Sequence, residues 1–140
     1  MTLVAETREV LLRIAAEFGT PCYVYVLDGV HRTLAELDRY FGGRFSISFA
    51  VKSNPNLAFL RRIASRVSAL DVSSIGELER ALMIGYEPAL LSFSGPAKRI
   101  PELQRALEAG CGEFVCESDW ELGELDRLAG DRGLRAVFSR

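Results

Sequence analysis

The sequence predicts an α/β protein in which strand–helix units repeat along a parallel sheet. Short apolar, β-prone segments alternate with longer segments whose apolar residues recur at helical spacing. From Phe45 onward, equivalent strand positions recur about 20 residues apart, which is enough chain for one strand and a crossover helix. Both a doubly wound open sheet and a (β/α)8 barrel have this pattern.

The expected strands are residues 22–27, 45–51, 69–73, 89–94, 113–116 and 135–139. The expected helices are residues 4–18, 30–41, 57–65, 75–84, 101–109 and 119–128. Asn54-Pro55 is typical of a cap followed by the first helical residue. Ser-x-x-Glu capping boxes and helix-ending glycines support the other boundaries. The capping boxes are Ser74 with Glu77 and Ser118 with Glu121, and the glycines are Gly85, Gly110 and Gly130.

The first parallel strand is not followed by a dinucleotide-binding motif, because residues 49–56 contain no glycine. A complete (β/α)8 barrel takes about 250 residues. This chain has 140 residues, with five expected strands from Phe45 onward. If it is a barrel, we expect a fragment with about five of the eight strands. The alternatives are closure by oligomerisation and a chain that folds poorly alone.

Composition and charge exclude several classes of function. The net charge is −2 and the basic residues are scattered, so no basic surface favours nucleic acid or a membrane. No apolar run reaches the roughly 18 residues that span a bilayer, and the N-terminus lacks a secretory core, so we expect a cytoplasmic protein.

Metal and disulfide sites are not expected either. The three cysteines form no CxxC motif, and no clustered His, Cys or carboxylate residues suggest metal ligands. His31, the single histidine, is expected on the solvent-exposed face of a helix.

Lys52 is the main candidate for chemistry. It ends the apolar strand 45–51, and in a parallel barrel the carboxyl ends of the strands form the active-site face. A lysine held against an apolar strand end is partly desolvated, which favours the free amine that a Schiff base to an aldehyde cofactor requires. By position alone, an ordinary lysine leaving the core for solvent remains the alternative.

The segment Phe-Ala-Val-Lys-Ser-Asn-Pro-Asn, residues 49–56, resembles the signature around the cofactor lysine of fold-type III pyridoxal-phosphate decarboxylases. That family acts on ornithine, lysine, arginine or diaminopimelate, and alanine racemase is a distant relative with a similar barrel. Four further blocks resemble family segments in the family's order and spacing. They are residues 19–26, 70–78, 91–98 and 114–119.

The resemblance implies the N-terminal part of a (β/α)8 (TIM) barrel that binds pyridoxal 5'-phosphate. Residues 29–140 would form the partial barrel, and residues 1–28 an N-terminal helix and a strand belonging to a separate β-domain. The implied activity is pyridoxal-phosphate-dependent decarboxylation of a diaminopimelate-, ornithine- or arginine-like amino acid by a homodimer. The phosphate-binding loop and the C-terminal β-domain would follow Arg140, so these residues do not select the substrate.

The resemblance also assigns roles within this chain. Lys52 would form the Schiff base, Asp71 would stabilise its protonated form, and Ala50 would leave room for the cofactor ring. Glu77 matches a glutamate near the cofactor, although its place in a capping box explains it equally well. Lys98 is expected to be a loop lysine and not a second catalytic amine.

Two other functions fit the same barrel. One is a racemase or a protein that carries pyridoxal phosphate. The other is a catalytically inactive, truncated partner that binds a full-length decarboxylase, for which the open edge of the sheet would be the contact.

Overall fold

The structure is a computed structural model that describes residues 5–131 and 137–139. Its contacts divide the chain into two compact units, Met1–Val30 and His31–Arg140. Helix α2 (Leu27–Phe41) begins in the first unit and continues in the second. The domain boundary expected after residue 28 stays a prediction, because this division does not show which domain the first unit belongs to.

The first unit contains helix α1 (Ala5–Phe18) and an extended segment that leads to α2. The strand predicted for residues 22–27 is wrong here: residues 22–26 have no strand assignment, and Leu27 already begins α2. The β-prone sequence does keep the backbone open, but a strand also needs a neighbour to hydrogen-bond with, and the described sheet contains only β1–β5.

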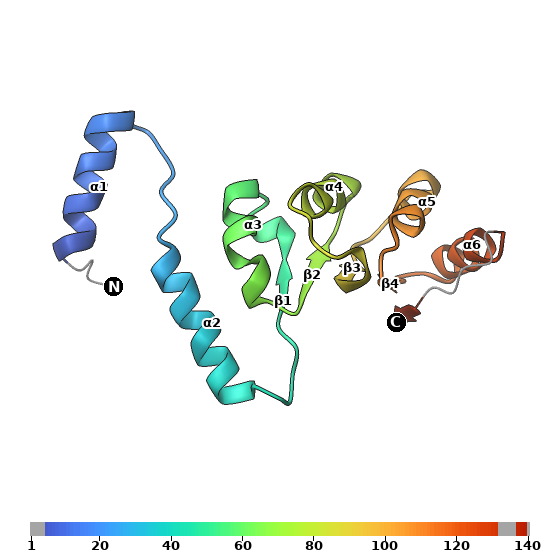
Figure 1. Ribbon diagram of the computed structural model, residues 1–140. Coiled ribbons are helices and arrows are strands. Elements are labelled where there is room, and N and C mark those ends of the chain that lie inside the picture. The colour runs from blue at the N-terminus through green and yellow to red at the C-terminus, as the bar shows by residue number, and fades with distance from the viewer. Residues whose placement is uncertain (1–4, 132–136, 140) are drawn as a thin grey trace. The chain divides into compact units, whose positions relative to one another are not determined.

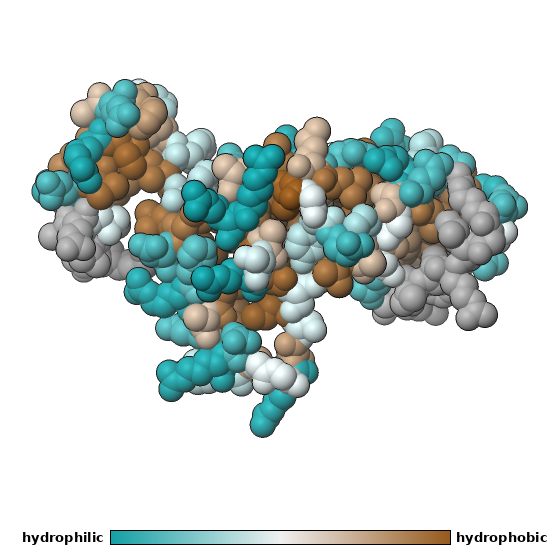
Figure 2. Space-filling model, viewed as in Figure 1, coloured by the Kyte–Doolittle hydropathy of each residue, from teal (hydrophilic) through white to brown (hydrophobic). Residues whose placement is uncertain are grey.

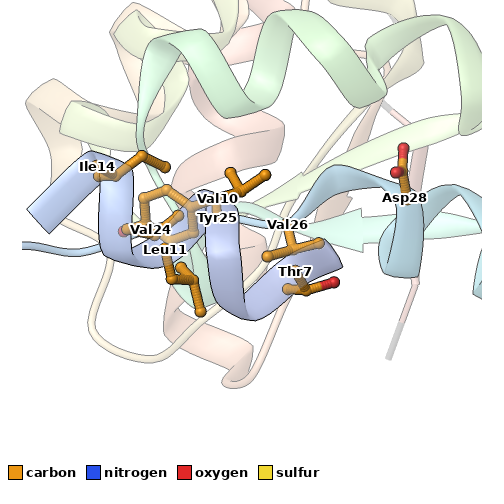
Figure 3. Close-up of a pocket in the computed structure, with 8 residues that line it drawn as sticks. All are labelled: Thr7, Val10, Leu11, Ile14, Val24, Tyr25, Val26 and Asp28. Carbon is orange, nitrogen blue, oxygen red and sulfur yellow. The ribbon is translucent and has the colours of Figure 1, made fainter. Parts of the chain in front are cut away.

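A groove lies between α1 and this extended segment within the first unit. Val10, Leu11 and Ile14 of α1 line it together with residues 24–26, as Figure 3 shows. Other apolar side chains of this unit stay exposed, among them Leu12 and Phe18, and Figure 2 shows brown apolar surface on α1. The first unit therefore buries little of its own apolar surface.

The second unit contains a five-stranded parallel sheet with strand order β1-β2-β3-β4-β5. The strands are β1 (Ser48–Ala50), β2 (Ala69–Val72), β3 (Leu91–Phe93), β4 (Glu113–Val115) and β5 (Val137–Ser139). Each strand neighbours the next one in the sequence, as in the wall of a barrel, whereas a doubly wound sheet reverses its strand order. The barrel expectation is confirmed for this portion.

Four helices follow the first four strands and lie in a row along the sheet (Figure 1). They are α3 (Leu57–Ile63), α4 (Ile75–Met83), α5 (Ile100–Ala109) and α6 (Asp119–Gly130). Three short 3-10 turns interrupt the connections: η1 (Val51–Ser53), η2 (Ala64–Arg66) and η3 (Pro88–Leu90). All the predicted parallel strands have a counterpart in the structure, and the first four are shorter than their apolar segments.

The two faces of the sheet differ in composition because successive side chains alternate between them. One face forms the core with the helices and carries large apolar side chains with at most 1% exposure: Leu70, Val72, Leu91, Phe93 and Phe114. The other face carries small or polar, half-buried side chains: Ala50, Asp71, Ser92 and Glu113, which form one row across four strands. This second face corresponds to the interior of a barrel.

Local hydrogen bonds confirm some predicted helix ends and correct one. Asn56, not Asn54, caps α3, because its Oδ1 accepts from the amides of Ala58 and Phe59. Asn54 Oδ1 instead accepts from the Asn56 amide, so Pro55 lies before the helix. Gly85 and Gly110 adopt φ angles of +74° and +82° after their helices, as expected for glycine at a helix end.

His31 is not the solvent-exposed histidine that we expected. Its Nε2 atom is buried and has no hydrogen-bond partner within the described part of the chain. The polar neighbours of His31 in the sequence gave no sign of this burial, which depends on contacts made only in the folded chain.

Among residues 5–131 and 137–139, no helix is long and apolar enough to cross a membrane. The same described residues contain no group of three potential His, Cys, Asp or Glu metal ligands.

Candidate active site at the carboxyl edge of the sheet

Lys52 lies in η1, directly after β1, at the carboxyl edge of the parallel sheet. The turn is fixed by two hydrogen bonds: Ser53 Oγ donates to the Ala50 carbonyl at 2.7 Å, and the Asn54 amide donates to the Val51 carbonyl at 3.0 Å. Val51 is fully buried, whereas Lys52 is exposed. The expected partial desolvation of Lys52 is therefore wrong for this structure, in which its side chain lies in solvent.

Asp71 lies in β2 directly beside Ala50 in the parallel register. Its half-buried side chain shares the small, polar face of the sheet with Ala50, two residues before Lys52. Asp71 is therefore one position short of the end of β2, and the register brings it to the same part of the sheet as the predicted lysine.

Glu77 joins the end of β2 to the beginning of α4. Its Oε2 accepts from the Ser73 amide at 2.8 Å, and its own amide donates to Ser74 Oγ at 3.3 Å. The capping box is thus present, except that the carboxylate reaches the residue before the cap. Oε1 of Glu77 has no hydrogen bond among the described residues. The structural role of Glu77 therefore occupies only one of its two carboxylate oxygens.

The side chains on the face beside Lys52 are small or polar. Ala50 adjoins Asp71, and Ser73 Oγ lies 3.4 Å from Ser94 Oγ on the next strand end. Large apolar side chains are on the opposite face, under the helices. The site therefore combines an exposed amine, a nearby carboxylate and small neighbours, which fits an aldehyde cofactor with a cationic imine nitrogen.

The chain has only one other lysine, Lys98, in the loop between β3 and α5. It is 4% exposed, and its Nζ donates to the Gly95 carbonyl at 2.7 Å, to the Val115 carbonyl at 2.8 Å and to Glu121 Oε1. An ammonium group has three hydrogens, so all of them are used. Lys98 is a loop lysine, as expected, and its amine is not available.

Sequence reasoning missed this buried ion pair. The sequence predicts only a capping-box role for Glu121, and its amide does donate to Ser118 Oγ at 3.1 Å. A signal was present, because Lys98 and Glu121 each follow a strand, and consecutive parallel strands bring such residues to one edge.

Comparison with known proteins gives matches over most of the chain. The family model for the pyridoxal binding domain of pyridoxal-dependent decarboxylases matches residues 27–138. The diaminopimelate decarboxylase of Pseudomonas aeruginosa is 42% identical over 132 residues, which cover 92% of this chain and 31% of that enzyme. The enzyme of Zymomonas mobilis is 39% identical over 133 residues.

Solved structures show the same fold. The Helicobacter pylori diaminopimelate decarboxylase, in complex with L-lysine, is 30% identical and matches with a TM-score of 0.78 over 94% of this chain and 33% of its own. A Vibrio vulnificus lysine/ornithine decarboxylase matches with a TM-score of 0.85 at 22% identity, over 98% of this chain and 37% of its own, and supports the fold alone. The chain thus spans about a third of the length of the relatives that it matches.

Proposed function

This chain belongs to the pyridoxal-dependent decarboxylase family, and on that premise we propose that Lys52 is its Schiff-base lysine in a site that decarboxylates an amino acid. One observation carries the choice of residue. Of the two lysines in the chain, Lys98 has every ammonium hydrogen bonded inside the protein, whereas Lys52 is exposed at the carboxyl edge of the sheet.

The other residues of this edge have roles that follow from their positions. When bound, pyridoxal phosphate supplies an aldehyde for the amine and a ring that accepts electrons from the Cα of the substrate. Asp71 supplies negative charge near the cationic nitrogen, and Ala50 leaves space beside it. Glu77 fixes the Ser73 amide and has one carboxylate oxygen left to contact the cofactor.

The proposed substrate is a diamino acid of the diaminopimelate type. The two curated relatives described above are both named diaminopimelate decarboxylases. Release of labelled carbon dioxide from carboxyl-labelled diaminopimelate, ornithine and arginine measures this choice. We also propose a cytoplasmic homodimer on the family resemblance, for which the mass in solution is the test.

The lysine assignment is tested by trapping the cofactor. In the chain mixed with pyridoxal phosphate, the Lys52 amine forms a C=N bond to the aldehyde carbon and water is lost. Borohydride then adds hydride to that carbon and leaves a stable secondary amine. Peptide mapping by mass spectrometry is expected to find the label on Lys52.

Lys98 is the internal control for this experiment, together with the variants Lys52→Arg and Lys98→Arg. We expect Lys52→Arg to abolish labelling above the background of the terminal amine, and Lys98→Arg to retain a labelled Lys52 wherever it folds. Labelling that is equal on both lysines, or unchanged in Lys52→Arg, would overturn the assignment.

A racemase or a carrier of pyridoxal phosphate would give the same label. The relatives favour the decarboxylase, because the family model and both curated relatives name that activity. Incubation with a single enantiomer of the amino acid separates the reactions, since decarboxylation releases carbon dioxide and racemisation only inverts Cα.

A further inference from the structure

Lys98 and Glu121 are the charged residues that the proposed function leaves unused although they are buried. Within the described residues they are the two buried charged side chains, with exposures of 4% and 2%. Burial of two charges carries a desolvation penalty that their mutual attraction has to offset. The fold therefore keeps this ion pair (the Lys98–Glu121 clamp) at a cost that an apolar pair would avoid.

The clamp joins three segments at the carboxyl edge of the sheet. Nζ of Lys98 bonds the Gly95 carbonyl in its own loop and the Val115 carbonyl at the end of β4. Glu121, in the first turn of α6, contacts Nζ with Oε1 and accepts from the Glu117 amide with Oε2 at 3.3 Å. The loops that follow β3 and β4 are thus fixed to each other through two side chains.

The loop that contains Lys98 has an unusual backbone conformation. Gly95 has a φ angle of +93°, and Ala97 has a φ angle of +57°, which is uncommon for a residue with a side chain. A left-handed alanine is strained and persists only where the surrounding contacts impose it. The three hydrogen bonds of Nζ are contacts of that kind.

A continuous set of contacts leads from the clamp to the proposed cofactor site. Gly95 lies against the end of β2, since a Cβ atom on it would be 3.3 Å from both Cβ and the carbonyl oxygen of Ser73. Ser73 Oγ is 3.4 Å from Ser94 Oγ, and the Ser73 amide donates to Glu77. Displacement of the Gly95 loop would therefore move the end of β2, which carries Asp71 and is bonded to Glu77 of α4 through the Ser73 amide.

We infer that Lys98 and Glu121 are positioning residues, which hold the loops after β3 and β4 in the shape that the Lys52 site needs. This inference rests on the proposed function of Lys52. The pair does not touch the reacting atoms and acts through Gly95 and Ser73.

The test separates positioning from simple stabilisation by removing both charges together. In Lys98→Met with Glu121→Leu no unpaired charge remains buried, and such replacements are often neutral for stability. Glu121→Gln removes only one of the two charges and keeps an acceptor for the Glu117 amide. The matched control removes the exposed ion pair between Arg105 and Glu79, which joins α5 to α4 at 2.7 Å.

Three quantities are measured on the whole chain: the urea midpoint, hydrogen exchange of the Glu117 amide, and the rate of borohydride-fixed labelling of Lys52. We expect both clamp variants to label Lys52 roughly 10- to 100-fold more slowly, as misplacement by about 1 Å does. The double variant should stay folded and exchange the Glu117 amide faster, because leucine offers that amide no acceptor. The control (Arg105→Met with Glu79→Leu) should label at the wild-type rate at a similar urea midpoint.

The outcomes are distinguishable. A clamp variant that is folded and labels Lys52 at the wild-type rate overturns the positioning role and leaves the proposed function intact. If labelling of Lys52 slows equally in the control and the clamp variants, the slowing reflects lost stability. That result also overturns the positioning role. If the wild-type chain is not labelled at Lys52, the proposed function fails, and the positioning role falls with it.

Discussion

Ala50 and Asp71 are paired neighbours in the parallel register of β1 and β2, two residues before Lys52. The small side chain and the carboxylate are on the face of the sheet that corresponds to the barrel interior. The lysine and the carboxylate come from different strands, so this register is what brings them to one edge. Four predictions follow from this arrangement and from the packing around it.

Asp71→Asn should slow the labelling of Lys52 by about tenfold, because the loss of about 1.4 kcal/mol of charge stabilisation at a cationic nitrogen corresponds to that factor. The side chain keeps its size, so the urea midpoint should stay close to wild type. Labelling rate and urea unfolding measured on the same sample check this. A wild-type labelling rate would remove Asp71 from the site.

The two roles of Glu77 separate in the variants Glu77→Ala and Glu77→Gln. Alanine leaves the Ser73 amide without its acceptor and should lower the free energy of unfolding by about 1 kcal/mol. Glutamine keeps an oxygen for that amide, so its stability should be near wild type. Slower labelling of Lys52 in Glu77→Gln would then indicate contact with the cofactor, whereas an unchanged rate would leave Glu77 as a cap only.

The two faces of the sheet should respond differently to substitution. Leu70→Ala removes a fully buried side chain beneath the helices and should cost about 2–5 kcal/mol of stability. Ala50→Leu enlarges a half-buried side chain on the opposite face and should block labelling of Lys52 with a smaller effect on stability. Urea unfolding measures the stability of both variants, and the rate of Lys52 labelling measures access to the site. A similar loss of stability in both would contradict the assignment of the faces.

The cysteines should differ in reactivity with pH. Burial raises the pKa of the Cys111 thiol to about 11, and burial also raises the pKa of Cys116. Only the thiolate reacts, so a raised pKa keeps both thiols neutral at pH 8 and moves their reaction to higher pH. Iodoacetamide should therefore modify the exposed Cys22 first, as peptide mapping over time can show. Rapid modification of Cys111 in the folded chain would contradict its burial.

Much of the site was predictable from the sequence because its signals are local. Strand–helix alternation and the capping boxes place Lys52, Asp71 and Glu77 at strand or helix ends, and parallel strands bring such ends to one edge. Resemblance to the decarboxylase family then distinguished Lys52 from an ordinary surface lysine. The cap of α3 lies two residues after the predicted one, at Asn56 and not Asn54, because asparagine is a good cap at either position and the sequence does not distinguish them.

The sequence by itself determined the order of the elements, their periodicity and the family. Only the tertiary structure decided which distant groups meet: that Ala50 pairs with Asp71, that Lys98 is buried against Glu121, and that His31 Nε2 is enclosed. It also decided that residues 22–26 are extended without becoming a strand. The reason is physical: propensity and capping act within a few residues, whereas register, burial and ion pairing depend on partners that only folding brings together.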